Sequence, residues 1–238
     1  FTCSLEQNML PDTLQVPVTF RDFIAAPTGS AVRHPDFEAF TGYEVTQNMI
    51  GTTLGPDGKP VYWGQCDATG GPYPDPAPGS GVCPSNQQLT TRASFDQWYR
   101  DVDGVNVSKL ERLTLQRDAA DGAYKYGNNA FFPWDNDPRS WVGRGQEQLL
   151  LDHDFGFTTE IHSYFQYNPN AQQPQVLSFT GDDDVWVFIN RRLVVDIGGS
   201  HVELTRSVTL DQATADSLRL EGGKIYEMAL FHAERHSD

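Results

Sequence analysis

The sequence of 238 residues has few basic residues and no long apolar segment. It holds 17 lysines and arginines against 32 aspartates and glutamates, which gives a net charge of −15. A basic surface for phosphates is therefore lacking, and this argues against binding to nucleic acid or to anionic lipid. No apolar run approaches the roughly 20 residues that cross a bilayer, so we predict no membrane span. The acidity instead favours cations as partners.

Sequence motifs of common enzyme classes are also lacking. There is no Gly-x-Ser-x-Gly elbow, no phosphate-binding loop and no His-Glu-x-x-His pair. A glycosidase needs two carboxylates placed across a cleft, and a sequence by itself does not fix that distance. We therefore predict that the protein is not an enzyme, and an extracellular hydrolase is the most distant alternative.

Cysteine is scarce, with only three residues in the chain. Cys66 and Cys83 bracket a loop rich in glycine and proline, which has little core of its own and would be stabilised by a disulfide. We predict a Cys66–Cys83 bond; two free thiols, or Cys3 paired with either, are the alternatives. No Cys-x-x-Cys pair is present, so a zinc site is disfavoured. The chain begins at Phe1 without a signal peptide, which indicates a processed or trimmed chain.

Glycine and proline are abundant, with 21 and 15 residues, and this composition predicts many turns and few long helices. Apolar side chains alternate with polar ones or form short runs in six segments, as expected of strands. These segments are 14–20, 155–167, 176–179, 185–189, 193–197 and 225–232. Pro17 limits the first of them to an edge or irregular strand. The run 185–189 has no alternation, so both of its faces are expected to be covered.

Two further segments complete the expected organisation. Residues 51–92 read as a loop-rich insertion, with one short strand at Val61–Trp63. Ser94, followed by Gln97 three residues later, predicts a capped short helix that lays aromatic residues on the core. Together the pattern predicts one all-β domain over residues 1–238. Its expected architecture is an antiparallel β-sandwich with long loop insertions and one or two short helices.

Three consecutive aspartates, Asp182 to Asp184, stand directly before the apolar run 185–189. Adjacent carboxylates repel one another, and a Ca²⁺ ion, which binds carboxylate oxygens, would make the arrangement favourable. An acidic turn with solvated side chains is the alternative.

Several motifs of the chain occur in an order that resembles the fibro-slime domain, one of the lectin-like β-sandwiches named after the anthrax protective antigen. The first is the run from Phe179 to Asn190, followed by Leu193–Asp196 and Gly198–His201. The others are Phe20–Phe23, His34–Glu38, Ser94–Asp101, Phe131–Pro133 and Phe231–His236. The resemblance covers almost the whole chain.

The resemblance implies a calcium site. In protective-antigen-type lectins, two consecutive aspartates joined by a cis peptide hold a Ca²⁺ that also binds vicinal hydroxyls of a sugar. The matching pair here is Asp182 and Asp183, with Asp184 at the start of the strand. The loop 182–184, including Asp184, and a second loop at 234–238, with Glu234 and His236, would frame the sugar; for the second loop, a polar strand end is the alternative. The resemblance also implies a further strand beyond the His-Ala-Glu-Arg-His segment. The sequence stops at Ser237-Asp238, so we expect either a sheet with an unpaired edge or a fragment of a longer chain.

The function expected from these features is a secreted or cell-surface module that binds carbohydrate through Ca²⁺ and acts in adhesion. The alternative is a structural module of an extracellular filament, matrix or sheath, which associates with itself or with other domains through a strand edge.

Overall fold

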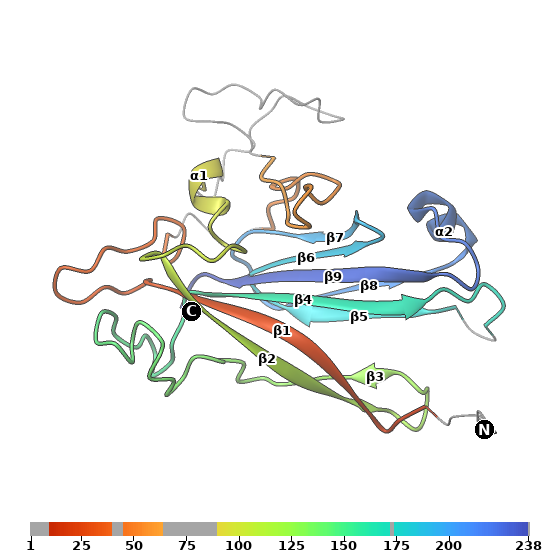
Figure 1. The fold of residues 1–238 in the computed structure, drawn as a ribbon, viewed down its shortest axis with the longest axis horizontal. Coiled ribbons are helices and arrows are strands. Elements are labelled where there is room, and N and C mark those ends of the chain that lie inside the picture. The colour runs from red at the N-terminus through yellow and green to blue at the C-terminus, as the bar shows by residue number, and fades with distance from the viewer. Residues whose placement is uncertain (1–9, 40–44, 64–89, 172–173, 238) are drawn as a thin grey trace, which may run out of the picture.

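Two antiparallel β-sheets form the protein in a computed structural model that describes residues 10–39, 45–63, 90–171 and 174–237 (Figure 1). In the larger sheet the strand order is β3-β2-β1-β4-β9-β6-β7, and the smaller sheet pairs β5 with β8. The strands of the larger sheet are β1 (Thr13–Phe23), β2 (Asn106–Arg117), β3 (Tyr124–Lys125), β4 (Phe157–Gln166), β6 (Asp184–Ile189), β7 (Arg192–Ile197) and β9 (Ile225–Glu234). Those of the smaller sheet are β5 (Val176–Gly181) and β8 (Leu204–Thr209). The predicted all-β, sandwich-like fold is confirmed.

Strand β6 shows why the two sheets pack together. All six of its residues are buried, and it lies between β9 and β7. Val185 and Val187 face the smaller sheet, where Leu177 and Phe179 of β5 pack against them. Because side chains alternate along a strand, Trp186 points to the opposite face. The prediction that both faces of this run are covered is therefore correct.

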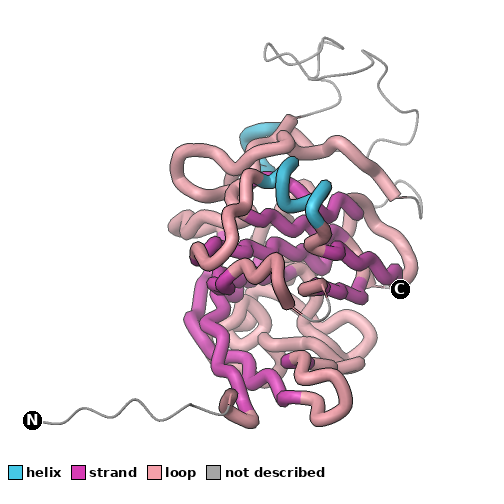
Figure 2. The backbone as a smooth tube through the Cα atoms, turned by 90° about the vertical axis from the view of Figure 1, so that its right-hand side faces the viewer, coloured by secondary structure: helices cyan, strands magenta, loops and turns pink. Residues whose placement is uncertain are grey.

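The opposite face of β6 and β9 is covered by a short helix and loops rather than by a third sheet (Figure 2). Helix α1 (Arg92–Phe95) is a single turn capped by Thr91, whose side chain accepts a hydrogen bond from Ser94 N. The expected cap at Ser94 was wrong by three residues, because Thr91 and Ser94 form the capping box instead. The aromatic residues of this segment lie on the core as predicted. They are Phe95, Trp98 and Tyr99, all at most 1 % exposed.

The predicted insertion at 51–92 is described only in part. Residues 51–63 pack onto the core through Leu54 and Tyr62. The expected strand at Val61–Trp63 is reduced to one isolated bridge between Tyr62 and Ile50. The three cysteines, Cys3, Cys66 and Cys83, lie outside the described residues, so the disulfide stays a prediction.

Two other elements differ from what the alternation of side chains indicated. Strand β2 was missed, because its apolar residues do not alternate regularly and Leu110 is 74 % exposed. β1 is an inner strand rather than an edge, yet its pairing with β4 begins only at Val18. Pro17 lies just outside this doubly paired part, where the lack of an N–H group is tolerated.

A second helix, α2 (Gln212–Leu218), precedes β9, which agrees with the prediction of one or two short helices.

Neither helix of the described residues has the length and apolar character needed to cross a membrane.

Burial of His34 beneath the core aromatics predicts a pH dependence of stability. Its ring is 5 % exposed, stacks edge-on against Phe23 and accepts a hydrogen bond from Asp36 N. Burial lowers the pKa of His34 to about 4. In the unfolded chain the His34 imidazole is protonated near pH 6.5. The contribution of neutral His34 to folding stability is therefore fully present above that pH and is lost as the pH falls toward 4. The loss is on the order of 3 kcal/mol.

A difference measurement isolates this contribution, because burial raises the pKa of Asp36 to about 6 and thereby acts in the opposite direction. Urea unfolding of the wild type and of His34→Gln is compared between pH 7.5 and pH 4. The destabilisation caused by the substitution is expected to shrink by about 3 kcal/mol over this range. A penalty that does not change with pH would contradict the buried, neutral imidazole.

Candidate functional site

The predicted acidic segment lies at one end of the larger sheet, next to the end of β9. Asp184 is the first residue of β6 and pairs with Ala233 of β9. On its other side β9 pairs with β4, where Glu234 lies opposite Phe157. The structure therefore brings together the segment 182–184 and the segment 234–236, which are about 50 residues apart in sequence. Both were expected to contribute to one site.

The carboxylate of Asp183 is buried and accepts backbone hydrogen bonds. Its side chain contacts His201 N at 3.3 Å through Oδ1, and Arg235 N at 2.9 Å and His236 N at 3.0 Å through Oδ2. The residue is 5 % exposed. Burial raises the pKa of Asp183 to about 7, against the opposing effect of the Arg235 charge. This carboxylate therefore joins the start of β6 to two loops.

Asp184 is neutralised by an arginine. Its Oδ2 lies 2.5 Å from Arg235 Nε, and its Oδ1 lies 2.6 Å from Gly199 N and 3.3 Å from Arg235 Nη2. Both side chains are almost fully buried, at 0 % and 2 % exposure. The guanidinium also lies 5.0 Å from the ring centroid of Trp98. Asp184 thus forms a buried ion pair with Arg235. Burial by itself lowers the pKa of Arg235, but the negative charges of Asp184 and Asp183 outweigh this effect and raise the pKa above its usual value.

Asp182 is half-buried, and its backbone oxygen accepts a hydrogen bond from His232 Nε2 at 2.9 Å. Among the described peptide bonds none is cis, so the expected cis bond between Asp182 and Asp183 is wrong. The trans form avoids the cost of roughly 3–4 kcal/mol of a non-proline cis bond. Asp183 already has three hydrogen-bond donors in this geometry.

The two residues expected in the second loop have different surroundings. His236 is held to Asp183 by its backbone N–H, and its ring Nε2 lies 3.7 Å from Glu38 Oε2. Ser237 N donates to Glu38 Oε1 at 2.7 Å, so the loop is bound on two sides. Glu234, the last residue of β9, is half-buried next to this loop. The structure therefore places Glu234 and His236 beside the aspartates, as expected of a shared site.

The hydrogen bonds limit how this segment could hold Ca²⁺. A carboxylate offers about four acceptor positions, and the three N–H donors leave Asp183 about one. Asp184 is engaged by Arg235 and Gly199 in the same way. A cation at this place would therefore draw mainly on Asp182 and on one oxygen of Asp183. Calcium binding by this pair remains a prediction.

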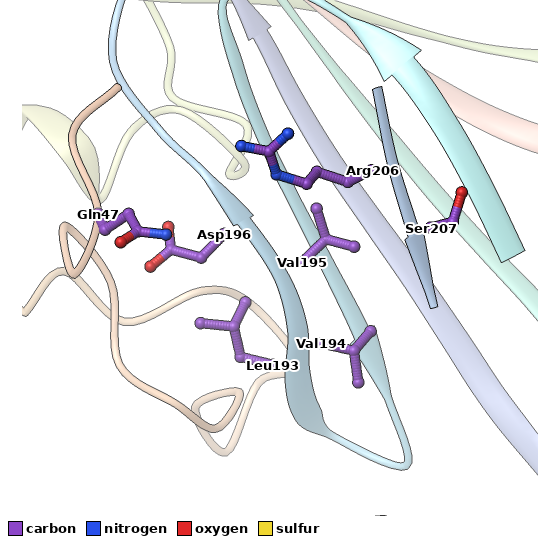
Figure 3. Close-up of a pocket in the computed structure, with 7 residues that line it drawn as sticks. All are labelled: Gln47, Leu193, Val194, Val195, Asp196, Arg206 and Ser207. Carbon is purple, nitrogen blue, oxygen red and sulfur yellow. The ribbon is translucent and has the colours of Figure 1, made fainter. Parts of the chain in front are cut away.

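A surface pocket lies elsewhere, between β7 and β8 (Figure 3). Its floor is apolar, and Asp196 and Arg206 stand at its sides. The lining residues are Gln47, Leu193, Val194, Val195, Asp196, Arg206 and Ser207. Asp196 is already used, since its oxygens accept hydrogen bonds from Asn48 N and Trp186 Nε1. None of the residues predicted to bind a ligand lines this pocket.

A second group of carboxylates, which sequence reasoning missed, comprises Asp22, Glu147 and Asp154. Asp22 pairs across the sheet with Phe157, which in turn pairs with Glu234, so this group lies at the same end of the sheet as the aspartate segment. Asp22 and Asp154 are more than 120 residues apart in the sequence. No local sequence pattern therefore indicates that the three carboxylates meet.

The chain is similar in sequence to several curated proteins of Dictyostelium discoideum. No family model matches the sequence. The chain is 33 % identical to protein psiR over 217 residues, which cover 86 % of the chain and 19 % of psiR. It is 34 % identical to protein psiD over 229 residues, 95 % of the chain and 40 % of psiD. Protein psiJ is 32 % identical over 236 residues, 93 % of the chain and 29 % of psiJ.

The chain spans about a fifth to two fifths of the length of these relatives. Their names state no activity. Among solved structures, a β-glucuronidase of Faecalibacterium prausnitzii shares 15 % identity over 33 % of the chain and 12 % of that structure, with a TM-score of 0.25. A similarity this low carries no argument about fold or function.

Proposed function

We propose that the chain is a carbohydrate-binding module of a secreted or cell-surface protein, that it depends on Ca²⁺, and that it acts in adhesion. The observation that supports this most directly is the meeting of the segments 182–184 and 234–236 at one end of the sheet. These are the segments that the resemblance to the fibro-slime domain assigns to the ion and the sugar. The net charge of −15 is consistent with a cation-dependent site and not with a nucleic acid partner.

Each residue has a role in the proposed site. Asp182 and Asp183 hold the ion, and the hydroxyls of a sugar complete its shell. Asp184 does not ligate the ion; its pairing with Arg235 holds the start of β6 in place. Glu234 and His236 border the sugar from the end of β9, and the hydrogen bonds to Glu38 keep their loop in position.

Calorimetric titration against a panel of mono- and oligosaccharides, in Ca²⁺ and in EGTA, tests the proposal. We expect at least one sugar to bind in Ca²⁺, with the affinity reduced by about tenfold or more in EGTA and in Asp182→Asn. Asp182 is the better position for substitution, because Asp183→Asn would also disturb three backbone hydrogen bonds.

Asp216→Asn is the matched control. Asp216 lies in α2, at the other end of the sheet (Figure 1), and its substitution should leave sugar binding unchanged. Absence of sugar binding in both buffers, or equal binding by the wild type and Asp182→Asn, would refute the proposed site.

The open edges of the smaller sheet support a second candidate function, that of a structural module in an extracellular assembly. Within the described residues, β5 and β8 pair only with each other, so each leaves one edge without a partner strand. Such an edge can pair with a strand of another copy. Val176, 58 % exposed at the start of β5, marks this edge.

Light scattering after size-exclusion chromatography would separate the two functions. An assembling module should form oligomers whose fraction grows with concentration and falls in Val176→Lys, since a charged edge disfavours pairing. A monomer at every concentration would exclude this second function.

A further inference from the structure

Three carboxylates converge in the interior where β1 meets the long connection between β3 and β4. Asp22 lies near the end of β1, and Glu147 and Asp154 lie in residues 126–156, which contain neither helix nor strand. The residues are 0 %, 5 % and 1 % exposed, respectively. One carboxylate oxygen of each lies within 4.8 Å of one oxygen of each of the other two.

Backbone hydrogen bonds fix two of these carboxylates through one oxygen each. Asp22 Oδ2 accepts from Trp141 N at 2.7 Å. Glu147 Oε1 accepts from Ala25 N at 2.6 Å and from Ala26 N at 2.9 Å. Their other oxygens, Asp22 Oδ1 and Glu147 Oε2, are buried without a hydrogen-bond partner in the described part of the chain. An orphaned buried carboxylate oxygen is costly unless it binds a proton or a cation.

Asp154 contributes the third carboxylate. Neither of its oxygens has a hydrogen bond of good geometry to a described residue, although the nearby Ser140 hydroxyl is the strongest influence that lowers its pKa. Its backbone N–H donates to Asp135 Oδ1 at 2.8 Å, so the main chain is held while the carboxylate faces the cluster. All three members therefore offer buried oxygens.

No arginine or lysine of the described residues forms an ion pair with this cluster. Lys109 Nζ instead donates a hydrogen bond to Pro133 O and forms ion pairs with Glu111 and Asp137. Arg144 stacks on the ring of Trp141 at 5.1 Å. Arg144 and Lys109 act on the cluster only from a distance. Three buried carboxylates without an ion-pair partner require a cation or protons to compensate them.

We propose that Asp22, Glu147 and Asp154 form a buried Ca²⁺ site. Ca²⁺ binds oxygen ligands at about 2.3–2.6 Å, so two ligands on opposite sides of the ion lie about 4.6–5.2 Å apart. The spacing of the three oxygens, at most 4.8 Å, fits such a shell. Carboxylate oxygens without nitrogen or sulfur ligands favour Ca²⁺ over Zn²⁺. Mg²⁺ usually keeps several waters and binds through one or two carboxylates, so a buried cage of three carboxylates favours Ca²⁺ over Mg²⁺.

The ion at this place has a structural role, separate from the proposed sugar site. Segment 145–148 lies along residues 25–28, with hydrogen bonds from Thr28 N to Gln146 O and from Gln148 N to Ala26 O. A cation shared by β1 and residues 126–156 would fasten this long connection to the sheet. Connections of this length without secondary structure are uncommon in compact domains, and a bound ion would restrict the motion of this one.

Binding of Ca²⁺ and of terbium(III) to chelator-treated protein tests the site. Terbium(III) substitutes for Ca²⁺ and luminesces when a nearby tryptophan is excited; Trp141, whose N–H groups both bond to Asp22, is placed to do this. We expect terbium luminescence that Ca²⁺ displaces, and a melting temperature about 5 °C or more higher in Ca²⁺ than in EGTA. Asp154→Asn should lose most of both responses. Asp182→Asn, which affects only the ion of the proposed sugar site, should keep most of them, and Asp216→Asn should keep them in full.

Two outcomes would overturn the proposal. One is a wild-type protein whose melting temperature and luminescence do not respond to either ion, as expected if protons alone compensate the cluster. The other is loss of the responses in Asp182→Asn with retention in Asp154→Asn, which would place the ion at the aspartate segment. Sugar binding is measured separately, so its absence bears only on the proposed function.

A measurement on the wild type covers the case in which Asp154→Asn does not fold. Limited proteolysis within residues 126–156 should slow by about tenfold or more when Ca²⁺ is added to the chelated protein, because cleavage requires local opening of the connection. Equal cleavage with and without Ca²⁺ would also overturn the proposal.

Discussion

Replacing Arg235 by methionine is expected to lower the free energy of unfolding by about 3–5 kcal/mol, because it leaves the buried charge of Asp184 without its partner. The pair is almost fully excluded from water, at 2 % and 0 % exposure, and Arg235 Nε lies 2.5 Å from Asp184 Oδ2. Methionine keeps much of the packing against Trp98, so the loss reports mainly on the charge. Urea denaturation at pH 7 measures it.

Two further variants make the result specific. Arg112→Met removes an exposed arginine of β2 and should change stability by no more than about 0.5 kcal/mol. Adding Asp184→Asn to Arg235→Met removes the orphaned charge and should recover part of the loss, which a double-mutant cycle quantifies. A loss below about 1 kcal/mol in Arg235→Met would show that the pair is not an essential part of this end of the sheet.

Replacing Phe231 by alanine should be similarly damaging, at about 3–5 kcal/mol, because it opens a cavity in the core. The side chain is fully buried in β9 and contacts Tyr99 at 4.9 Å and Phe188 at 5.9 Å between ring centroids. The midpoint of urea denaturation should fall while its slope stays the same.

Tyr164→Ala is the matched control for this core substitution. Tyr164 is an aromatic residue of the neighbouring strand β4, but 68 % of it is exposed. Its removal should cost much less than that of Phe231, since little apolar surface is uncovered. Similar losses in the two variants would contradict the assignment of the core to this face of β9.

Some features of the fold could be predicted from the sequence, and others could not. Local alternation is enough to find most strands, because each side chain of a strand faces either core or solvent. It failed for β2, whose exposed Leu110 breaks the alternation, and for the cap at Thr91, where two hydroxyl residues compete for one role. Pro17 indicated an edge or irregular strand, whereas β1 is an inner strand whose pairing with β4 begins at Val18, one residue after Pro17.

For the candidate sites, the sequence indicated where the acidic residues lie but not which groups compensate their charges. The run of three aspartates was visible as an unusual concentration of charge, and its place at the start of β6 followed from the apolar residues after it. How each carboxylate is compensated was not visible. Arg235, which neutralises Asp184, is 51 residues away in sequence, and the N–H groups that bind Asp183 come from two loops.

By itself the sequence determined the all-β class, most strands, the acidic balance and the acidic segment at the strand start. These follow from composition and from the local periodicity of side chains, which need no knowledge of distant partners. Only the tertiary structure decided which carboxylates are paired and which are not. It gave Asp184 a guanidinium and Asp183 three backbone donors, and among the described residues it buried Asp22, Glu147 and Asp154 together without an ion-pair partner. The physical reason is that the compensation of a charge depends on its neighbours in space, and chain folding brings these from anywhere in the sequence.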